Sequence, residues 1–334
     1  MLPEDNLTPR PDDLVENAIT VVDGNDGVLN GQDYILFYAQ GPDTWVRDSA
    51  NKRFRHRKNL YADRSFYFLN ISITENGLRM QSRVGAGPAN QVVTTFRDRF
   101  FHELDSLNLL RSGKEWLGEE FGSAPGKLLN RSFQLNVPNA VSGQPSIFIS
   151  NVAVRSVGAA SGFLVRINNT PVVQHLANAT GGGQYDPVAV IHEAGQSFTA
   201  GTSLSVQYSF QAASVNAQGW LNWFELFVQR QLSMAGVNQL LFRDWESVGP
   251  GNSAEFRIQS ATALTQVWDV TQPLRPVAVT GTLSGSELRF TAAAAALREY
   301  VAFNNQNFLR PEAMGRIGNQ DLHNSAPADY LIIT

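Results

Sequence analysis

Alternation of apolar and polar residues dominates the middle of the chain and predicts strands. The clearest case is the run from Ser203 to Phe210, in which every second residue is apolar. A period of two belongs to a strand with one face in a core and the other in solvent. About eight short segments of this kind lie between Lys127 and Leu232, separated by Gly, Asn and Pro turns. The pattern predicts an antiparallel β-sandwich of jelly-roll type.

The regions on either side of this sandwich also favour strands. Apolar runs occur before it, as at 33–38 and 65–73, and after it, as at 265–270. Two stretches allow helix: the apolar spacing of 93–121 fits a helical period, although Ser112-Gly113 would end a helix early, and five alanines at 292–296 favour one short turn. The predicted fold class is therefore mainly β.

A chain of 334 residues exceeds what one ordinary core supports, so several domains are expected. The patterns divide the chain into an N-terminal β-rich domain, the sandwich, a second small β domain and the start of a further domain. The predicted boundaries are 1–125, 126–235, 236–310 and 311–334.

The last residues carry an apolar run, Tyr330 to Ile333, after a turn-like segment that contains Pro327. Such a run is typical of a strand buried on both faces, as in the parallel sheets of α/β domains. It could complete an existing sheet, or it could be the first strand of a further α/β domain. The second interpretation makes the preceding residues a segment in front of a catalytic domain.

Composition excludes several classes of function. Hydrophobic residues make up 43% and charged residues 17% of the chain, as in folded globular domains. A net charge of −4 argues against general nucleic-acid binding. The chain has no cysteine, which removes disulfides, thiolate metal ligands and a cysteine nucleophile. Its first residues do not resemble a signal peptide, so an exported protein would carry its signal upstream of Met1.

Motifs of known catalytic chemistry are missing from the sequence. It has no nucleophile elbow, P-loop, zinc-protease helix or dinucleotide fingerprint. The five histidines are scattered, and the adjacent pairs His102-Glu103 and His192-Glu193 would point to opposite faces of a strand. No catalytic residue and no organic cofactor is predicted.

The best candidate for a ligand site is the turn Asp23-Gly-Asn-Asp-Gly27 with Asp33 beyond it. Oxygen-bearing side chains of this kind could surround a hard cation such as Ca²⁺. Asp and Asn also dominate ordinary turns, because their side chains accept hydrogen bonds from nearby backbone amides. The candidate metal ligands are Asp23, Asn25, Asp26 and Asp33.

Two further clusters have a structural and a functional interpretation each. The basic run from Lys52 to Lys58 could be a solvated hairpin or a contact for an anionic glycan or lipid head group. Trp220, Trp223 and Phe224 could stack on sugars, although alternation along their strand would bury at least one face of it.

Several segments resemble, in order, one family: the gingipain-like cysteine peptidases of sortase type that belong to the type IX secretion system of Bacteroidetes. The matching segments are MLPEDN, VENAITVVDGNDGVLNGQDYILFYAQGPDTW, HRKNLYADRSFYFLN, HELDSLNLLRSGKEWLGEEF, GWLNWFELFVQRQL, NQLLFR, VWDVTQP and APADYLIIT. They span nearly the whole chain, and their shared order makes the resemblance more specific than any one of them.

The resemblance implies that this region precedes the peptidase domain and that the family's catalytic His and Cys lie beyond Thr334. It implies an exported protein at the outer membrane or cell surface. The implied partners are the downstream catalytic domain, the C-terminal signal domains of secreted cargo and an anionic lipopolysaccharide. Whether the parent protein is an active peptidase stays open. The alternative is a cell-surface carbohydrate-binding β-sandwich protein.

Overall fold

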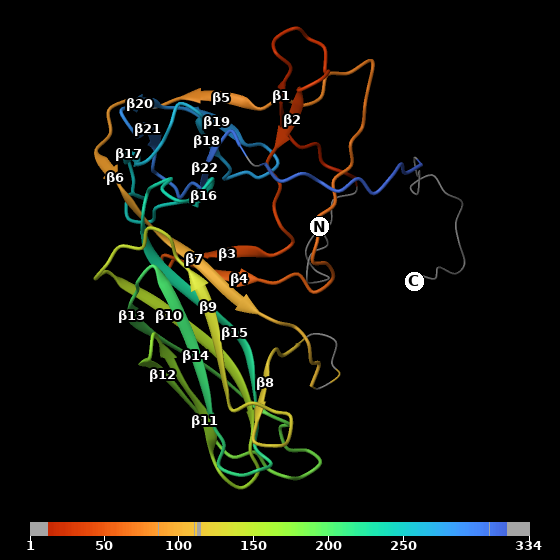
Figure 1. Ribbon diagram of the computed structural model, residues 1–334, viewed down its shortest axis with the longest axis vertical. Coiled ribbons are helices and arrows are strands. Elements are labelled where there is room, and N and C mark those ends of the chain that lie inside the picture. The colour runs from red at the N-terminus through yellow and green to blue at the C-terminus, as the bar shows by residue number, and fades with distance from the viewer. Residues whose placement is uncertain (1–12, 86, 110, 112–114, 307, 319–334) are drawn as a thin grey trace.

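A computed structural model describes residues 13–85, 87–109, 111, 115–306 and 308–318 of the chain. Within these residues all regular elements are strands and no helix occurs, which confirms the predicted mainly β fold. The strands form a large sandwich and a second, smaller unit, with two hairpins beside them (Figure 1). None of the described residues lies in a helix long and apolar enough to cross a membrane.

The sandwich consists of two antiparallel sheets. One sheet has the order β13-β10-β15-β7, with β8 also paired to β15, and the other has the order β12-β11-β14-β9. The strand bounds are β7 Thr95–Glu103, β8 Glu120–Gly122, β9 Asn130–Asn136, β10 Pro145–Arg155, β11 Ser161–Ile167, β12 Thr170–Ala177, β13 Val190–Thr199, β14 Ser203–Gln211 and β15 Gln218–Gln231.

The core of the sandwich lies between these sheets and follows the predicted alternation. In β14 every second side chain, from Leu204 to Phe210, is buried. Rings from both sheets fill the space, among them Phe148, Tyr208 and Phe224, each fully buried. The hydroxyl groups of Tyr208 and Ser150 lie 2.7 Å apart and satisfy each other inside this apolar core.

The second unit also has two sheets, in the orders β16-β22-β18-β19-β5 and β20-β21-β17-β6. Its core is aromatic, with Phe242, Phe256, Phe290 and Tyr300 in mutual contact. The strand bounds are β5 Gln81–Val84, β6 Gln91–Val93, β16 Gln239–Phe242, β17 Ser253–Ile258, β18 Thr265–Asp269, β19 Val277–Thr280, β20 Thr282–Ser284, β21 Glu287–Ala293 and β22 Tyr300–Asn304.

Two hairpins come from the N-terminal part of the chain. The first pairs β1 (Ile19–Val22) with β2 (Tyr34–Phe37), and the second pairs β3 (Thr44–Asp48) with β4 (Arg53–Arg57). Figure 1 shows the β3–β4 hairpin between the sandwich and the second unit. It therefore occupies the junction between the two large parts of the molecule.

The structure differs from the sequence predictions in local details. The stretch 93–121 contains the strands β7 and β8 instead of a helix, and the alanines at 292–296 extend β21 and then bend. Intrinsic helix propensity is a weak preference, which pairing of β21 with β17 overrides. The predicted strand at 330–333 lies outside the described residues.

The four-domain division stays a prediction, but strand pairing crosses its first boundary. Strands β7 and β8, from the predicted N-terminal domain, hydrogen bond to β15 of the sandwich. Strands β5 and β6 pair in parallel with β19 and β17 of the second unit. The region 81–122 is thus shared between the two large units.

A buried charged junction as the candidate functional site

The β3–β4 hairpin packs on the outer face of the sandwich. Phe54 is 3% exposed and contacts Ile149 and Phe227 from that face and Leu297 from the second unit. Trp45 lies edge-on to Phe101 at 5.5 Å. The outer face of β15 is therefore covered as well as its inner face, which explains why nearly all of its residues are buried.

His56 lies at the centre of this contact between two carboxylates. Its Nδ1 is 2.6 Å from Oε1 of Glu225, and its Nε2 is 2.8 Å from Oε2 of Glu103. The backbone N–H of His56 also donates to Glu225, at 2.8 Å. The imidazole stacks on Phe101 with a ring separation of 4.5 Å. The side chain of His56 is only 5% exposed, so these contacts replace water almost completely.

The two carboxylates keep this imidazole charged. Burial lowers the pKa of His56, but the hydrogen bonds to Glu103 and Glu225 outweigh it and raise the pKa to about 9. Both ring nitrogens donate, so His56 is not free to accept a proton near neutral pH. The arrangement works as a buried ion triad that joins the hairpin to two strands of the sandwich, β7 and β15.

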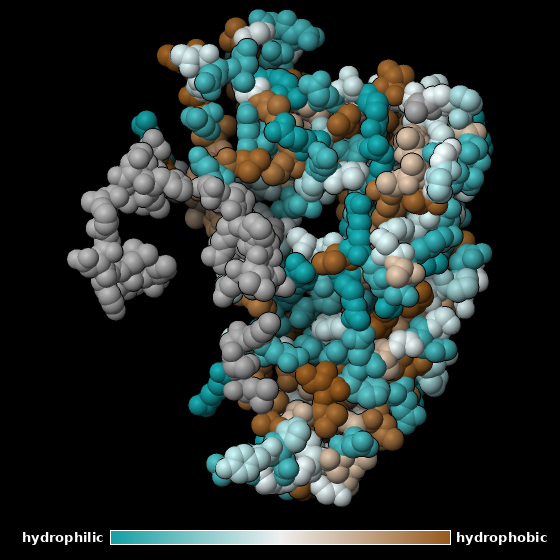
Figure 2. Space-filling model, turned by 180° about the vertical axis from the view of Figure 1, so that it is seen from behind, coloured by the Kyte–Doolittle hydropathy of each residue, from teal (hydrophilic) through white to brown (hydrophobic). Residues whose placement is uncertain are grey.

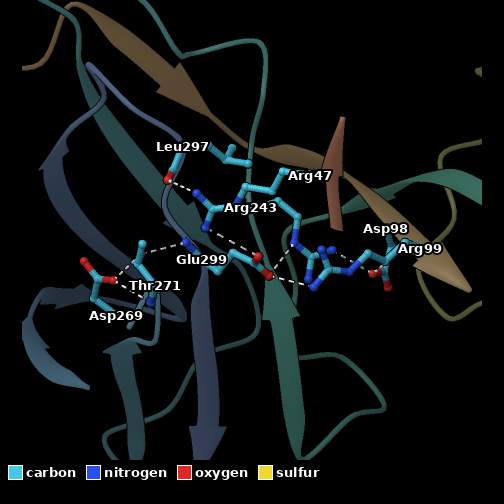
Figure 3. Close-up of polar contacts among 8 residues, drawn as sticks. All are labelled: Arg47, Asp98, Arg99, Arg243, Asp269, Thr271, Leu297 and Glu299. Carbon is cyan, nitrogen blue, oxygen red and sulfur yellow. Dashed lines mark hydrogen bonds and ion pairs between the residues drawn. The ribbon is translucent and has the colours of Figure 1, made fainter. Parts of the chain in front are cut away.

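A second ion network lies beside the first and joins all three parts of the molecule (Figure 3). Glu299 of the second unit forms ion pairs with three arginines: Arg99 of β7 at 2.7 Å, Arg243 at 3.6 Å and Arg47 of the hairpin at 3.7 Å. Asp98 binds Arg243 at 3.3 Å and also contacts Arg230. Hairpin, sandwich and second unit thus share one charged layer.

The arginines of this layer are strongly desolvated. Arg243 is 1% exposed, and the guanidinium of Arg99 lies over the ring of Phe54 at 4.0 Å. Burial and the neighbouring Arg243 lower the pKa of Arg99 to about 10, against the opposing effect of Glu299. Buried charges of this kind require partners in a fixed geometry, so the layer constrains how the two units sit on each other.

An acidic residue near the edge of the junction has a perturbed pKa. Burial and the charge of Glu103 raise the pKa of Asp105 to about 6, and Lys58 opposes this. The carboxylates of Glu103 and Asp105 lie at the end of β7, close to His56. A raised carboxyl pKa is common at functional sites and equally common in structural ion networks, which is the context here.

The structure brings together two histidines that are far apart in the sequence. Nδ1 of His175 on β12 lies 2.9 Å from Nδ1 of His192 on β13. Burial and the neighbouring His192 lower the pKa of His175 to about 3, so His175 is neutral near pH 7. Among the described residues no group of three or more His, Asp or Glu is arranged to hold a metal ion.

The predicted calcium ligands lie in the loop between β1 and β2. Asp23 accepts a hydrogen bond from the N–H of Asn25 at 3.0 Å, and Asp26 accepts one from Val28 at 2.9 Å. Asp33 accepts one from Asn30 at 2.6 Å. The bonds of Asp23 and Asp26 are those of Asx turns, that of Asp33 is also local, and positive φ at Asn25 and Gly27 fits the same turn chemistry. Calcium binding at Asp23, Asn25, Asp26 and Asp33 stays a prediction.

The basic run at 52–58 is engaged in ion pairs within the molecule. Lys52 pairs with Glu246 at 3.4 Å, Arg53 with Asp48 at 3.1 Å and Arg55 with Glu193 at 2.8 Å. These pairs leave less positive charge for an anionic ligand.

Trp220 and Phe224, which are 2% and 0% exposed, are too buried to stack on a sugar. Trp223 is half-buried against the Phe54 cluster, and the guanidinium of Arg55 lies over its ring at 5.4 Å. Of the two interpretations of this aromatic cluster, the burial of Trp220 and Phe224 supports the structural one.

Sequence reasoning missed the His56 triad, although one signal for it was present. Glu225 is the only ionised residue inside the apolar run from Gly219 to Val228. A carboxylate at such a position requires a buried partner. The identity of that partner, 169 residues away along the chain, was not visible in the pattern.

Together these features define a mainly β protein of two packed units with a structural ion network between them. The chain is similar in fold to the dimeric latent PorU from Porphyromonas gingivalis, with a TM-score of 0.77 and 19% sequence identity. The likeness covers 97% of this chain and 30% of the PorU chain. At this identity it shows the fold, and the chain spans less than a third of the length of PorU.

The other comparisons add no assignment. The CBM36-1 domain of a multidomain xylanase from the hindgut metagenome of Trinervitermes trinervoides matches with a TM-score of 0.26 and 6% identity, over 39% of this chain and 96% of that one. This score is too low to inform fold or function. No protein-family model and no curated protein matches the chain.

Proposed function

We propose that this chain is the non-catalytic segment that precedes the peptidase domain of a secreted gingipain-like cysteine peptidase. In that family the peptidase is a type IX secretion sortase that processes the C-terminal signal domains of cargo. One observation carries the proposal: the fold matches PorU over nearly all of this chain but over under a third of PorU. The ordered sequence motifs of the family support it.

The proposed role of the segment is to position substrate and partners for the downstream domain. The ion layer around Glu299 and the Phe54 cluster support this role, because they fix the two β units in one arrangement. Loops on a rigid scaffold are well placed to bind a partner, and the cargo signal domain is the proposed one. An anionic lipopolysaccharide is the proposed acceptor of processed cargo.

The alternative, a carbohydrate-binding β-sandwich protein, has less support. The aromatic residues that suggested it are Trp220, Trp223 and Phe224, and two of them are buried in cores. The basic run at 52–58 is largely engaged in ion pairs. No specific observation favours a sugar site over the proposed role.

The proposal is tested on the gene and on two proteins made from it. We expect the open reading frame to continue past codon 334 into an α/β domain with a His and a Cys. The 334-residue chain should not cleave unfolded protein or Arg- and Lys-containing peptides, because it has no cysteine. The longer protein should remove a C-terminal signal domain from a cargo protein, and its Cys→Ala variant should not.

Two results would contradict the proposal. One is a stop codon directly after Thr334, and the other is cleavage by the 334-residue chain that persists through repurification. If deletion of residues 13–306 from the longer protein left its cleavage of cargo unchanged, only the positioning role would be contradicted.

A further inference from the structure

A strip of exposed apolar side chains runs along two adjacent segments, residues 60–73 and 308–318. Arg64 and Glu312 hold the segments side by side through an ion pair of 3.3 Å, and Figure 1 shows the two segments crossing on one side of the molecule. The exposed residues of this apolar strip are Leu60, Tyr61, Phe66, Tyr67, Phe68, Leu69, Ile71, Ile73, Leu309, Met314 and Ile317.

The exposure in the strip is unusually high for large apolar residues. Leu69 is 78% exposed, Ile71 82% and Leu309 96%. Over the sandwich, Figure 2 shows hydrophobic residues intermixed with hydrophilic ones. A contiguous exposed apolar surface is characteristic of an interaction site.

The strip is held in place by contacts of its own backbone and rings. Tyr67 packs on Phe37 of β2 with ring centroids 5.0 Å apart, and its hydroxyl donates to the carbonyl of Gln40 at 3.3 Å. Phe308 packs on Phe303 of β22 at 6.0 Å. These anchors present the strip in a fixed position, so a partner that covers it does not have to order it first.

Part of the backbone of the strip, at residues 66–71, is also unpaired. Residues 66–71 are extended, belong to no described strand, and their N–H groups make no hydrogen bond to any other residue that the structure describes. An extended apolar segment with free backbone groups is a template for a further strand. The element that covers it therefore needs both an apolar surface and a strand edge or equivalent hydrogen-bonding groups.

We infer that the apolar strip is the docking surface for the domain that follows in the same polypeptide, an inference that rests on the proposed function. Residues 309–317 supply three residues of the strip, Leu309, Met314 and Ile317, and precede that domain in the chain. If the domain begins near Asp329, its first residue lies at most about 40 Å from Gly318, the reach of eleven extended residues. Such a tether gives the downstream domain a high effective concentration at the strip, which a second copy or a free cargo protein lacks.

Hydrogen exchange on two proteins tests the docking. In the 334-residue chain, the N–H groups of residues 66–71 should exchange almost as fast as in an unfolded peptide. In the full-length protein they should exchange at least about 100-fold more slowly, because docking buries them. The double variant Phe68→Asp/Ile71→Asp should restore fast exchange at residues 66–71 in the full-length protein. The same two substitutions in the 334-residue chain should leave its melting temperature unchanged.

The matched control is Leu176→Asp/Val215→Asp, which changes two apolar residues that are 61% and 76% exposed in the sandwich. It should leave exchange at residues 66–71 unaffected in both proteins. Equal exchange of these residues in the two proteins overturns the docking. Protection that rises with the concentration of the 334-residue chain identifies a second copy as the partner, and protection that needs added cargo signal domain identifies cargo. Either result also overturns the docking of the downstream domain on the strip.

Failure of this inference differs from failure of the proposed function. A gene without a peptidase domain after codon 334 overturns the proposed function. A gene with that domain, whose product leaves residues 66–71 unprotected, overturns the docking alone.

Discussion

The two N-terminal hairpins both carry charged residues but satisfy them in different ways. In the β1–β2 loop, Asp23 and Asp33 bond to backbone groups two and three residues away. In β3–β4, His56 and Arg55 find their partners 169 and 138 residues away, in Glu225 and Glu193. The charges of the first hairpin are satisfied within its own loop, and those of the second depend on the surface that it covers.

This difference follows from desolvation. The charged groups of the β1–β2 loop are at least partly hydrated, so short local hydrogen bonds suffice. The hairpin β3–β4 buries Phe54 and His56, and a charge taken out of water needs a partner in good geometry. Its stability is therefore coupled to the sandwich and to the second unit through buried charges, while β1–β2 contacts the second unit through the apolar packing of Leu36.

The largest expected effect comes from breaking the His56 triad. Glu225→Ala should destabilise the protein by about 3 kcal/mol, because it removes one carboxylate from a buried imidazolium. Denaturant unfolding followed by tryptophan fluorescence measures the change. The control is Glu246→Ala, which removes the 69% exposed partner of Lys52 and should cost at most about 0.5 kcal/mol. Equal losses in the two variants would show that burial does not distinguish these ion pairs.

Truncating one apolar residue in each hairpin compares their packing directly. Phe54→Ala should cost about 3 kcal/mol, since the ring is buried between sandwich and second unit. Phe37→Ala in β2 removes a half-buried ring and should cost about 1 kcal/mol. Thermal unfolding of both variants checks the order. A larger loss for Phe37→Ala would contradict the assignment of β3–β4 as the coupled hairpin.

The pH dependence of stability should reveal the His56 triad. The folded-state pKa of about 9 exceeds the usual value of 6.5, so the folded protein holds a proton that the unfolded chain releases. The stabilisation is complete below pH 6.5 and is lost at about 1.4 kcal/mol per pH unit as the pH rises to about 9. The variant His56→Gln should lack this slope. If the stability of the unmodified protein did not change between pH 6.5 and 9, the charged state of the His56 triad would be contradicted.

His175 gives the opposite dependence and serves as an internal comparison. Its folded-state pKa of about 3 is below the usual value, so the unfolded chain binds the extra proton. Stability should fall at about 1.4 kcal/mol per unit as the pH drops below 6.5. His175→Gln should reduce this acid slope and leave the alkaline one intact.

The smallest expected effect is that of calcium on the β1–β2 loop. Binding at a concentration equal to the Kd would add about 0.4 kcal/mol. Asp23→Ala should abolish this increment, and Asp13→Ala, outside the loop, should keep it. Melting temperatures in calcium and in chelator measure it. Identical values for the unmodified protein would mean that the loop is an ordinary turn.

The pattern of the sequence was sufficient to predict strands, because alternation reports directly on burial of one face. The run from Ser203 to Phe210 became β14 with the expected side chains inside. The same reasoning failed for 292–296, where pairing with β17 decided the outcome. It was also incomplete for β15, since no local pattern says that a distant hairpin covers the outer face of a strand.

By itself, the sequence determined the mainly β class, the sandwich strands and the local turn chemistry of the β1–β2 loop, because these depend on neighbours within a few residues. Only the tertiary structure decided which charges are buried together. Arg47, Asp98, Arg99, Arg243 and Glu299 come from distant parts of the chain. They meet because sheet pairing and hydrophobic packing bring their strands into contact, and the low dielectric of that junction then makes each partner necessary.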